Sequence, residues 1–353
     1  MFGLFGKKKD LVGIDIGSSS VKLVQLARIK DGYQLQNIGI VPLPPEAIVD
    51  NSLMDSGSVV DAIKNLIASL GIKAKEVACS ISGNAVIIRK ISLSAMTSEE
   101  LEDQIGWEAE QYIPFDIKDV HLDFQILGAD PVDPARMQVL LVASKKDIIN
   151  DYVAMFADAG LTLSVMDVDG FALQNAWELG AAVSGEDVLA LVNIGASIMN
   201  MNVVRGETSL FTRDVQMGGN LYTEEIQKQL GVGSQEAESL KMLAHEVATQ
   251  PLHEVIGRVN DTISQEIRRS IDFYNSTAAN EDRIGAICLS GGGSKVQGLR
   301  EALQERLGME VRFLNPFAAI TYNEKDFDPE YLQEIAPLMA VGVGLAIRRV
   351  GDK

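Results

Sequence analysis

A strand–turn–strand pattern occurs twice in this sequence, and the two copies lie about half of the 353-residue chain apart. The first copy runs from Leu11 to Leu26 and the second from Val188 to Val204, each with two apolar segments around a short polar turn. A glycine opens each turn, Gly17 in the first copy and Gly195 in the second. Apolar runs bounded by turn residues are typical of paired strands. A repeat at this spacing predicts two related halves that face one another.

Residues 76–163 carry their own alternation of strand and helix patterns between the two copies. Thr97 is placed to cap a helix over Glu99–Tyr112. A second helix is expected over Asp147–Ala159, because Gly160 follows it as a C-terminal cap. Strand-like segments separate these helices. The segment is large enough to form an inserted α+β subdomain.

The charge balance limits the kinds of partner that the surface can attract. The chain has 49 acidic and 31 basic side chains, a net charge of −18. Such a surface repels phosphate backbones and anionic headgroups, which argues against a nucleic acid partner. No segment approaches the ~20 apolar residues that a spanning helix needs. We therefore expect a cytoplasmic protein whose contact with a membrane is indirect.

Two smaller features concern the N-terminus and the cysteines. Met1–Lys9 places apolar residues before three lysines, which is the reverse of a secretion signal. We interpret it as a solvated tail, with an interfacial lipid anchor as the alternative. Cys79 and Cys288 stand in apolar, strand-like runs and are interpreted as buried thiols in a reducing compartment.

The first hairpin contains residue types that can bind phosphate and metal. Gly17 permits a tight turn, and the hydroxyls and amide groups of Ser18, Ser19 and Ser20 can surround phosphate oxygens. Asp15 ends the first strand and can hold a hydrated Mg²⁺, while Lys22 can neutralise phosphate charge. The alternative is an ordinary polar turn between strands, and this motif alone does not decide between them.

A third glycine turn follows a strand late in the chain. Gly291, Gly292 and Gly293 precede Ser294, and a helix is expected from about Val296. Glycine backbone offers a flat surface for a planar base, and a helix N-terminus beside it favours anionic groups. A plain strand-to-helix turn is the alternative, although three successive glycines cost more chain entropy than such a turn needs.

The order of these motifs along the chain resembles the actin, heat-shock chaperone and sugar kinase superfamily. The motifs are Asp15-x-Gly17, Asn193-x-Gly195, Gly218-Gly219-Asn220, Glu238-x-x-Lys241 and Gly291-Gly292-Gly293. The segment Met217–Lys241 is similar to the cell-division protein FtsA and to the type IV pilus assembly protein PilM family. Trp107–Phe115, Asp123–Leu127 and Glu266–Tyr274 resemble the PilM family in particular. The likeness extends from about Leu11 to Arg349.

The resemblance implies an actin-like, ribonuclease H-like duplicated α/β fold with an inserted α+β subdomain of SHS2 type. The expected division is a tail at 1–9, domain I at 10–75, 164–186 and 336–353, the insert at 76–163, and domain II at 187–335. It also implies ATP and Mg²⁺ as ligands. The implied phosphate- and metal-binding residues are Asp15, Gly17, Ser18, Ser19, Ser20, Lys22, Asn193, Gly195, Ala196 and Ser197. Gly218, Gly219 and Asn220 would line the phosphate–ribose side, and Glu238 and Lys241 would reach the ribose or base. The adenine would lie on Gly291, Gly292, Gly293 and Ser294, and Asp169 would orient the attacking water.

One residue departs from the pattern of the superfamily. The second hairpin usually begins with an aspartate, and here the position is Asn193. An amide in place of a carboxylate removes a negative charge near the metal and a group that can polarise water. We therefore expect ATP to bind while hydrolysis is slow or absent, with the nucleotide structural or regulatory.

The resemblance further implies a place in the pilus assembly platform at the cytoplasmic face of the inner membrane. PilM-like proteins clasp the cytoplasmic N-terminal peptide of PilN, a membrane protein, between domain I and the inserted subdomain. Other platform and motor proteins, and a homo-oligomer or ring, are further expected partners. The alternatives are an FtsA-like filament-forming ATPase, a phosphotransferase of the same superfamily and a nucleotide-free structural module. His121, His245 and His253 lack metal-ligand spacing and receive no chemical role.

Overall fold

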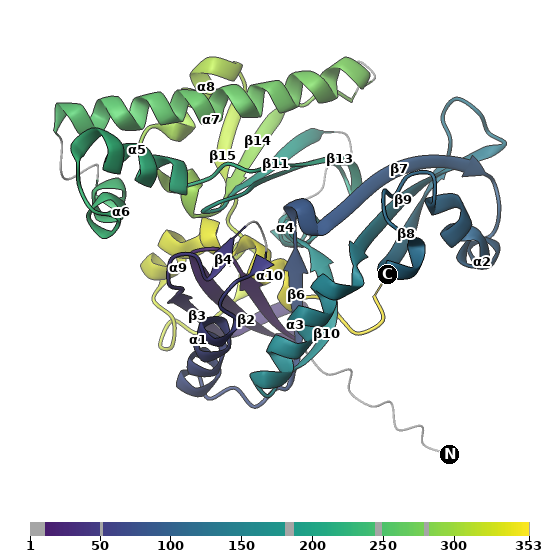
Figure 1. The fold of residues 1–353 in the computed structure, drawn as a ribbon, viewed down its shortest axis with the longest axis horizontal. Helices are drawn as coiled ribbons and strands as arrows, with labels where there is room; N and C mark the ends of the chain where they lie inside the picture. The colour runs from purple at the N-terminus through teal and green to yellow at the C-terminus, as the bar shows by residue number, and fades with distance from the viewer. Residues whose placement is uncertain (1–10, 50–51, 181–186, 244–248, 279–281, 353) are drawn as a thin grey trace.

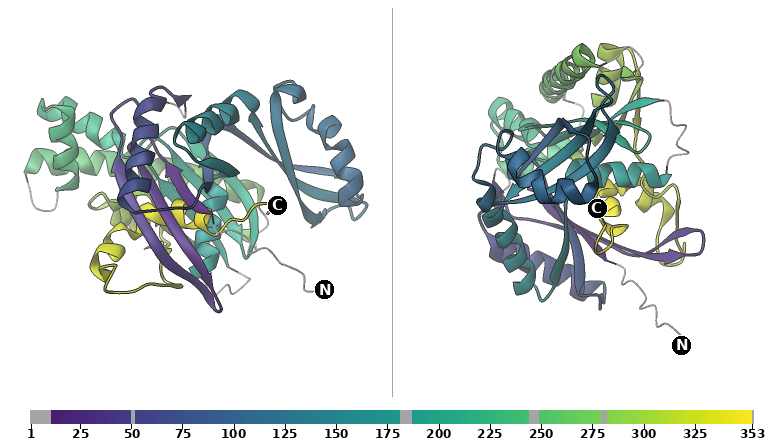
Figure 2. Two further views of the ribbon diagram at one scale, coloured as in Figure 1. Left: turned by 90° about the horizontal axis from the view of Figure 1, so that it is seen from below. Right: turned by 90° about the vertical axis from the view of Figure 1, so that its right-hand side faces the viewer.

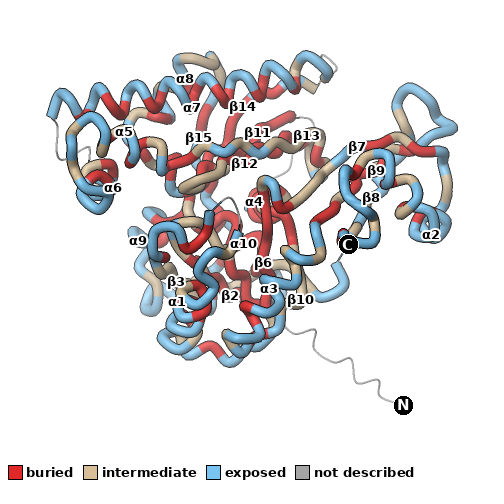
Figure 3. The backbone as a smooth tube through the Cα atoms, viewed as in Figure 1, coloured by how far each residue is buried: buried red, intermediate tan, exposed pale blue. Residues whose placement is uncertain are grey.

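Two sheets of the same topology, joined by central helices, make up the body of the protein (Figure 1). The computed structural model describes residues 11–49, 52–180, 187–243, 249–278 and 282–352. The expected tail at 1–9 and His245 lie outside the described residues. Buried residues concentrate along the strands and on the helix faces that cover them (Figure 3). Cys79 and Cys288 are buried and free, as the sequence predicted.

The sheet of domain I has six strands in the order β10-β6-β1-β2-β3-β16. They are β1 (Val12–Ile16), β2 (Ser20–Ile29), β3 (Gly32–Pro42), β6 (Glu76–Ile81), β10 (Thr162–Val168) and β16 (Ile320–Thr321). The first three form an antiparallel meander, while β6 runs parallel to β1 and β10 runs parallel to β6. A short hairpin of β4 (Ile48–Val49) and β5 (Ser52–Leu53) follows the meander.

The sheet of domain II repeats this order as β15-β14-β11-β12-β13. Its strands are β11 (Val188–Ile194), β12 (Met199–Arg205), β13 (Thr208–Val215), β14 (Ala286–Ser290) and β15 (Glu310–Phe313). β11, β12 and β13 form the meander, and β14 and β15 add in parallel on the other side of β11. The prediction of two related halves is confirmed, because both sheets place a meander beside two parallel strands.

Helices cover the outer faces of both sheets and fill the space between them (Figures 1 and 2). Domain I is covered by α1 (Ser56–Ser69) and α3 (Lys146–Asp158), and domain II by α5 (Asn220–Leu230), α6 (Ser234–Met242), α7 (Gln250–Thr277) and α8 (Leu299–Leu307). α9 (Pro329–Ile335) packs beside β3, while α4 (Asp169–Gly180) and α10 (Ala340–Ala346) lie centrally against each other. Gly344 makes the close approach of α10 possible, since a Cβ there would lie 1.7 Å from the Ala172 carbonyl oxygen. None of the helices in the described residues is both long enough and apolar enough to cross a membrane.

The inserted subdomain projects from the body beside domain II (Figures 1 and 2). It contains β7 (Val86–Ser94), α2 (Ser98–Ala109), β8 (Val120–Ala129) and β9 (Arg136–Lys145), with strand order β7-β9-β8. α2 packs its apolar residues Leu101, Ile105 and Ala109 on one face of the sheet. Thr97 caps the helix by accepting a hydrogen bond from the Glu100 amide, as expected. The helix ends at Ala109 rather than Tyr112, because a turn toward Pro114 begins there.

The expected domain boundaries differ from the structure at three places. Residues 76–81 do not open the insert, because β6 pairs with β1 and β10 inside the sheet of domain I. Residues 146–158 form α3, whose Tyr152, Met155 and Phe156 belong to the core of domain I. The insert therefore extends over about residues 86–145. Domain I also resumes before residue 336, since β16 pairs with β3. Apolar patterns locate strands, but they do not reveal the partner with which each strand pairs.

Candidate functional site

The turns of the two hairpins meet between domain I and domain II. Ser18 lies in the turn between β1 and β2, and Ser197 lies in the turn between β11 and β12. Their hydroxyl oxygens are 2.8 Å apart and share a hydrogen bond. The structure therefore brings together the two turns that the sequence predicted to bind phosphate from opposite sides.

The first hairpin supplies one carboxylate and one amine at this meeting point. Asp15 and Lys22 are opposite each other in the register of β1 and β2. Their charged groups form an ion pair with an Nζ–Oδ2 distance of 3.0 Å, and both side chains are largely buried. The Gly17 amide donates to the Ser20 carbonyl and closes the turn at 3.1 Å. Lys22 is thus held beside the turn where an anion would bind.

The second hairpin is held from behind by the loop that leads into α5. The Gly219 amide donates to the Gly195 carbonyl and the Asn220 amide donates to the Ala196 carbonyl, both at 2.8 Å. A Cβ on Gly218 would lie 2.4 Å from the Gly195 carbonyl oxygen, so only glycine permits this approach. Asn220 also donates from its side chain to the Ser197 hydroxyl at 3.1 Å. The second turn is therefore more tightly fixed than the first.

The set of hydrogen-bond donors at the two turns fits a polyphosphate. In the part of the chain that the structure describes, the amide groups of Ser18, Ser19, Ala196 and Ser197 donate no hydrogen bond to a protein group. Successive free amides of this kind form a concave site for anions. Hydroxyl groups and the Lys22 ammonium stand beside them. These residues could hold the phosphates of a nucleotide.

Asn193 belongs to a chain of hydrogen bonds that crosses domain II and reaches domain I. Its side-chain Nδ2 donates to Oδ1 of Asn200 at 3.1 Å, and the Nδ2 of Asn200 donates to Oδ1 of Asp214 at 2.8 Å. The Gly83 amide, directly before the insert, donates to the other Asp214 oxygen at 2.5 Å. The side-chain Oδ1 of Asn193 accepts from the Ser290 hydroxyl at 3.3 Å.

Sequence reasoning missed Asn200 and Asp214. A signal existed for Asn200, because it stands at the same place relative to Gly195 as Lys22 does relative to Gly17. No motif marked Asp214.

The glycine turn packs directly on the second hairpin. Gly291 has φ +82°, and a Cβ there would lie 2.3 Å from the Ile194 carbonyl oxygen. The Ser294 hydroxyl is buried and donates to the Gly291 carbonyl at 2.7 Å, which stabilises the turn itself. The expected helix from Val296 is wrong in its start, since Gly292–Lys295 is a 3-10 turn and α8 begins at Leu299. The left-handed conformation at Gly298 separates the two.

Glu238 and Lys241 lie at the same side of the site and hold each other. The Lys241 ammonium donates to Glu238 at 2.6 Å, to the Thr223 hydroxyl at 3.2 Å and to the Gly219 carbonyl at 3.4 Å. Lys241 is buried, while the Glu238 side chain is half exposed. Lys241 thereby links α6 to the loop that supports the second hairpin, and Glu238 faces the solvent side.

Asp169 begins α4, and its carboxylate accepts a hydrogen bond of 2.6 Å from the Ser80 hydroxyl at the end of β6. Burial raises the pKa of Asp169 to about 6, and the negative charge of Asp15 adds to the rise. Hydrogen bonds from Ser80 and Ser82 oppose it. A carboxylate with this pKa can accept a proton near neutral pH. Asp169 therefore lies within the electrostatic influence of the first hairpin.

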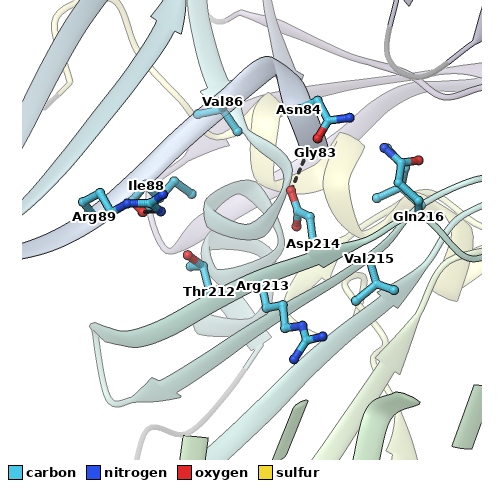
Figure 4. Close-up of a pocket in the computed structure, with 11 residues that line it drawn as sticks. Gly83, Asn84, Val86, Ile88, Arg89, Thr212, Arg213, Asp214, Val215 and Gln216 are labelled. Atoms are coloured by element: carbon cyan, nitrogen blue, oxygen red, sulfur yellow. Dashed lines mark hydrogen bonds between the residues drawn. The ribbon is translucent and has the colours of Figure 1, made fainter. Parts of the chain in front are cut away.

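A cavity of about 200 Å³ opens where domain I, domain II and the insert adjoin (Figure 4). It lies between β7 and β13, which are edge strands of their sheets. Asp214 crosses one side of it to reach Gly83, as the dashed line in Figure 4 shows. The lining residues are Gly83, Asn84, Val86, Ile88, Arg89, Ile198, Thr212, Arg213, Asp214, Val215 and Gln216.

The duplicated sheets and facing hairpins define an actin-like ATPase fold. MreB5 of Spiroplasma citri bound to AMPPNP superposes with a TM-score of 0.50 at 11% identity, covering 96% of this chain and 95% of that one. The ethanolamine utilization protein EutJ from Carboxydothermus hydrogenoformans gives a TM-score of 0.59 at 15% identity, covering 97% and 90%.

The sequence profile of the type IV pilus assembly protein PilM family matches residues 13–350, so the chain belongs to that family. A solved PilM–PilN type IV pilus biogenesis complex contains a chain with a TM-score of 0.88 and 30% identity, covering 98% of this chain and 100% of that one. Cell division protein FtsA of Streptococcus pneumoniae is 24% identical in an alignment of 348 positions that covers 86% of this chain and 75% of FtsA.

Proposed function

We propose that this chain binds ATP between its two hairpins and docks the cytoplasmic N-terminal peptide of a PilN-like, single-span membrane protein. It would act in the type IV pilus assembly platform at the cytoplasmic face of the inner membrane. The observation that carries the proposal is the 30% identity, over 98% of the chain, to the chain of the PilM–PilN complex. The turn amides that donate no hydrogen bond to a protein group among the described residues, together with the Lys22 ammonium, support the nucleotide part.

The residues at the turns divide the work of binding in this proposal. The amides of Ser18, Ser19, Ala196 and Ser197 would bind phosphate oxygens, and Asp15 would hold Mg²⁺ through water. Bound Mg²⁺ would supply charge neutralisation between the phosphates. The glycine turn at Gly291–Gly293 would lie under the adenine, and Asn220 with Glu238 would face the ribose.

The polar contacts of Asn193 support a nucleotide that is held rather than rapidly hydrolysed. Its side-chain amide carries no charge. The amide nitrogen donates to Asn200 and the amide oxygen accepts from Ser290, so the side chain offers no base to an attacking water. Asp169 would be left to orient that water, with its proton affinity set by burial. Catalysis of phosphoryl transfer depends on such positioning and charge stabilisation.

A phosphate-release assay on the full chain with Mg²⁺ and ATP tests this part. We expect turnover slower than about one per minute, far below typical enzymes with ~10 per second. Asn193→Asp should raise the rate, and Asp169→Asn should lower whatever rate remains. Turnover of several per second by the unaltered chain would contradict the proposal.

The place of the insert suggests where the peptide docks. The insert contributes none of the phosphate-binding residues. The cavity at its junction with both domains is lined by residues of β7 and β13, each of which stands at the edge of its sheet among the described residues. Extended peptides bind such edges through main-chain hydrogen bonds. We therefore place the docking region at the start of the insert, around Gly83–Arg89.

Removal of the insert tests the docking region. Val86 and Ser144 are paired neighbours across β7 and β9, so a short glycine-containing turn can replace residues 86–145 without separating the ends. We expect the shortened chain to bind ATP normally and to lose the PilN-like peptide in a pull-down. Undiminished peptide binding by this variant would refute the assignment, and loss of ATP binding as well would mean that the body had not folded.

An FtsA-like filament is a second candidate, because FtsA of Streptococcus pneumoniae matches 86% of this chain. Sedimentation of the full chain with ATP separates the two. Pelleting that depends on ATP would favour the filament, and a fixed small oligomer or ring would favour the platform adaptor.

A further inference from the structure

Trp107 is an exposed aromatic side chain on the outer face of the inserted subdomain. Its exposed fraction is 84%, whereas the other tryptophan, Trp177 in α4, is only 7% exposed. α2 points Leu101, Ile105 and Ala109 into the core of the insert, so Trp107 takes no part in holding the helix to its sheet. Exposing so large an apolar side chain forgoes its burial free energy, which favours a role in contact with another molecule.

The position of α2 separates this side chain from the nucleotide site. The helix lies at the outer end of the insert, on the far side from the two hairpins (Figure 1). Pale blue covers most of α2 in Figure 3, consistent with a face open to solvent. A contact made here is therefore distinct from nucleotide binding and from the cavity at the start of the insert.

Carboxylates surround Trp107 on the same helical face. Residues three or four positions apart on a helix are neighbours, so Asp103 and Glu110 lie beside Trp107, and both are exposed. Neither has an ion-pair partner within the residues that the structure describes, and α2 itself contains no lysine or arginine. The face therefore combines one large aromatic side chain with uncompensated negative charge.

Phe115, a second aromatic residue of the insert, differs from Trp107 in that a cation of the same chain lies over its ring. Phe115, which follows α2, carries the Lys145 ammonium 4.2 Å from its ring centre. Over the described part of the chain, no cation is stacked on Trp107. Tryptophan is the best aromatic partner for a cation, and the contact strengthens when water is excluded. The ring of Phe115 is already occupied by Lys145 of the same chain, whereas the indole of Trp107 is open to a cation from another molecule.

We propose that the face of α2 around Trp107 docks a basic, amphipathic helix of another protein. An arginine or lysine of that helix would lie over the indole, and flanking basic residues would pair with Asp103 and Glu110. Charge complementarity selects this occupant, because carboxylates repel nucleic acids and anionic lipid surfaces. The helical spacing of the three residues matches basic residues three to four positions apart on the partner.

A designed probe peptide tests the proposal on the full chain. The probe is a labelled 18-residue helical peptide with arginines and one leucine along one face, and its scrambled form spreads the arginines around the helix. We expect the probe to bind more tightly than its scrambled form and to shift the fluorescence of Trp107 to shorter wavelength. Trp177, being buried, should supply a constant background.

Two matched variants decide whether the face itself is recognised. Trp107→Ala should lower probe affinity about tenfold, in the range of interface hot spots. Asp103→Asn with Glu110→Gln should lower it several-fold and flatten its salt dependence. The control, Asp151→Asn with Asp158→Asn, removes the same charge from exposed positions of α3 and should leave affinity unchanged. Equal losses in the α2 and α3 double variants, or unchanged binding by Trp107→Ala, would overturn the proposal.

Discussion

The two hairpins at the centre of the protein share a register and differ in charge at one matched pair of positions. In the first hairpin, Asp15 faces Lys22, and the two form an ion pair of 3.0 Å. In the second, Asn193 faces Asn200, and the two amides form a neutral hydrogen bond of 3.1 Å. The two hairpins therefore share their backbone pairing, and they differ in that one has a charged pair where the other has a polar one.

The turns of the two hairpins also differ in how closely other segments pack on them. The uncharged second hairpin has the closer packing. The loop at Gly218 and the glycine turn at Gly291 both pack closely on the second hairpin. The first turn is held by the Leu43 amide, which donates to the Ser19 carbonyl at 2.9 Å, and by the hydrogen bond between Ser18 and Ser197. This division assigns the electrostatic part of nucleotide binding to the first hairpin and the fixed frame to the second. This division of roles agrees with the proposal that bound ATP is held and seldom hydrolysed.

Removing the charge of the first hairpin should have the largest effect. Asp15→Asn leaves Lys22 without its partner and deprives Mg²⁺ of its carboxylate, so we expect the affinity for Mg²⁺-ATP to fall about a hundredfold, or ~3 kcal/mol. Calorimetric titration measures this. As a matched control, Asn200→Asp changes one charge in the second hairpin and should alter affinity much less. Equal effects of both would erase the distinction between the hairpins.

The influence of Asp15 on Asp169 predicts a pH effect on stability. The pKa of Asp169 rises to about 6 in the folded protein from an ordinary 3.8, so the folded state binds the proton more tightly than the unfolded state. Stability contributed by this group is therefore present below pH ~4 and is lost as pH rises through 6.

Asp169→Asn should remove that dependence and stabilise the protein by about 3 kcal/mol at pH 7.5 relative to the unaltered chain, since each pKa unit is worth ~1.4 kcal/mol. Thermal midpoints between pH 4 and pH 8 test it. A parallel decline for both proteins over this range would show that another group titrates.

Matched glycines test how differently the two turns are packed. A Cβ on Gly195 would lie 2.8 Å from the Ile198 carbonyl oxygen, whereas one on Gly17 would lie 3.5 Å from the Lys22 amine. We expect Gly195→Ala to cost about 1.5 kcal/mol through forced backbone shifts and Gly17→Ala less than about 0.5 kcal/mol. Thermal melting of the two variants measures the difference, and a larger loss for Gly17→Ala would reverse the account of which turn is fixed.

The smallest expected effect concerns the contact between the turns. Ser197→Ala should cost about 1 kcal/mol, because its hydroxyl also accepts from Asn220, while Ser18→Ala should cost about 0.5 kcal/mol. The double variant should cost less than the sum, since both changes remove the same bond. Strict additivity would mean that the two hydroxyls do not interact in solution.

The repeated hairpin could be predicted from sequence because its signal is local. Apolar runs, a glycine and small polar residues recur in the same order, and the sheets confirm the two related halves. The extent of the insert could not be predicted, because Glu76–Ile81 has the same apolar character whether it pairs with β7 or, as observed, with β1 and β10.

The polar chain from Asn193 to Asp214 illustrates a second limit. Asn200 could have been found by aligning the two copies, but its hydrogen bond to Asp214 depends on the pairing of β12 with β13. The further link from Asp214 to Gly83 joins residues 131 positions apart, across the two domains. Contacts that arise only when separate elements pack leave no trace in local pattern.

Titration of the unaltered full-length chain with ATP in the presence of Mg²⁺ tests the central claim most directly. Calorimetry should give one binding site per chain, and the affinity should fall when Mg²⁺ is removed, because Asp15 would then add to the charge of the phosphates instead of holding the metal. Saturating ATP should also raise the thermal midpoint, with about 2.7 kcal/mol of added stability at a hundredfold excess over Kd. Absence of binding at millimolar ATP, with no change in the midpoint, would contradict the account.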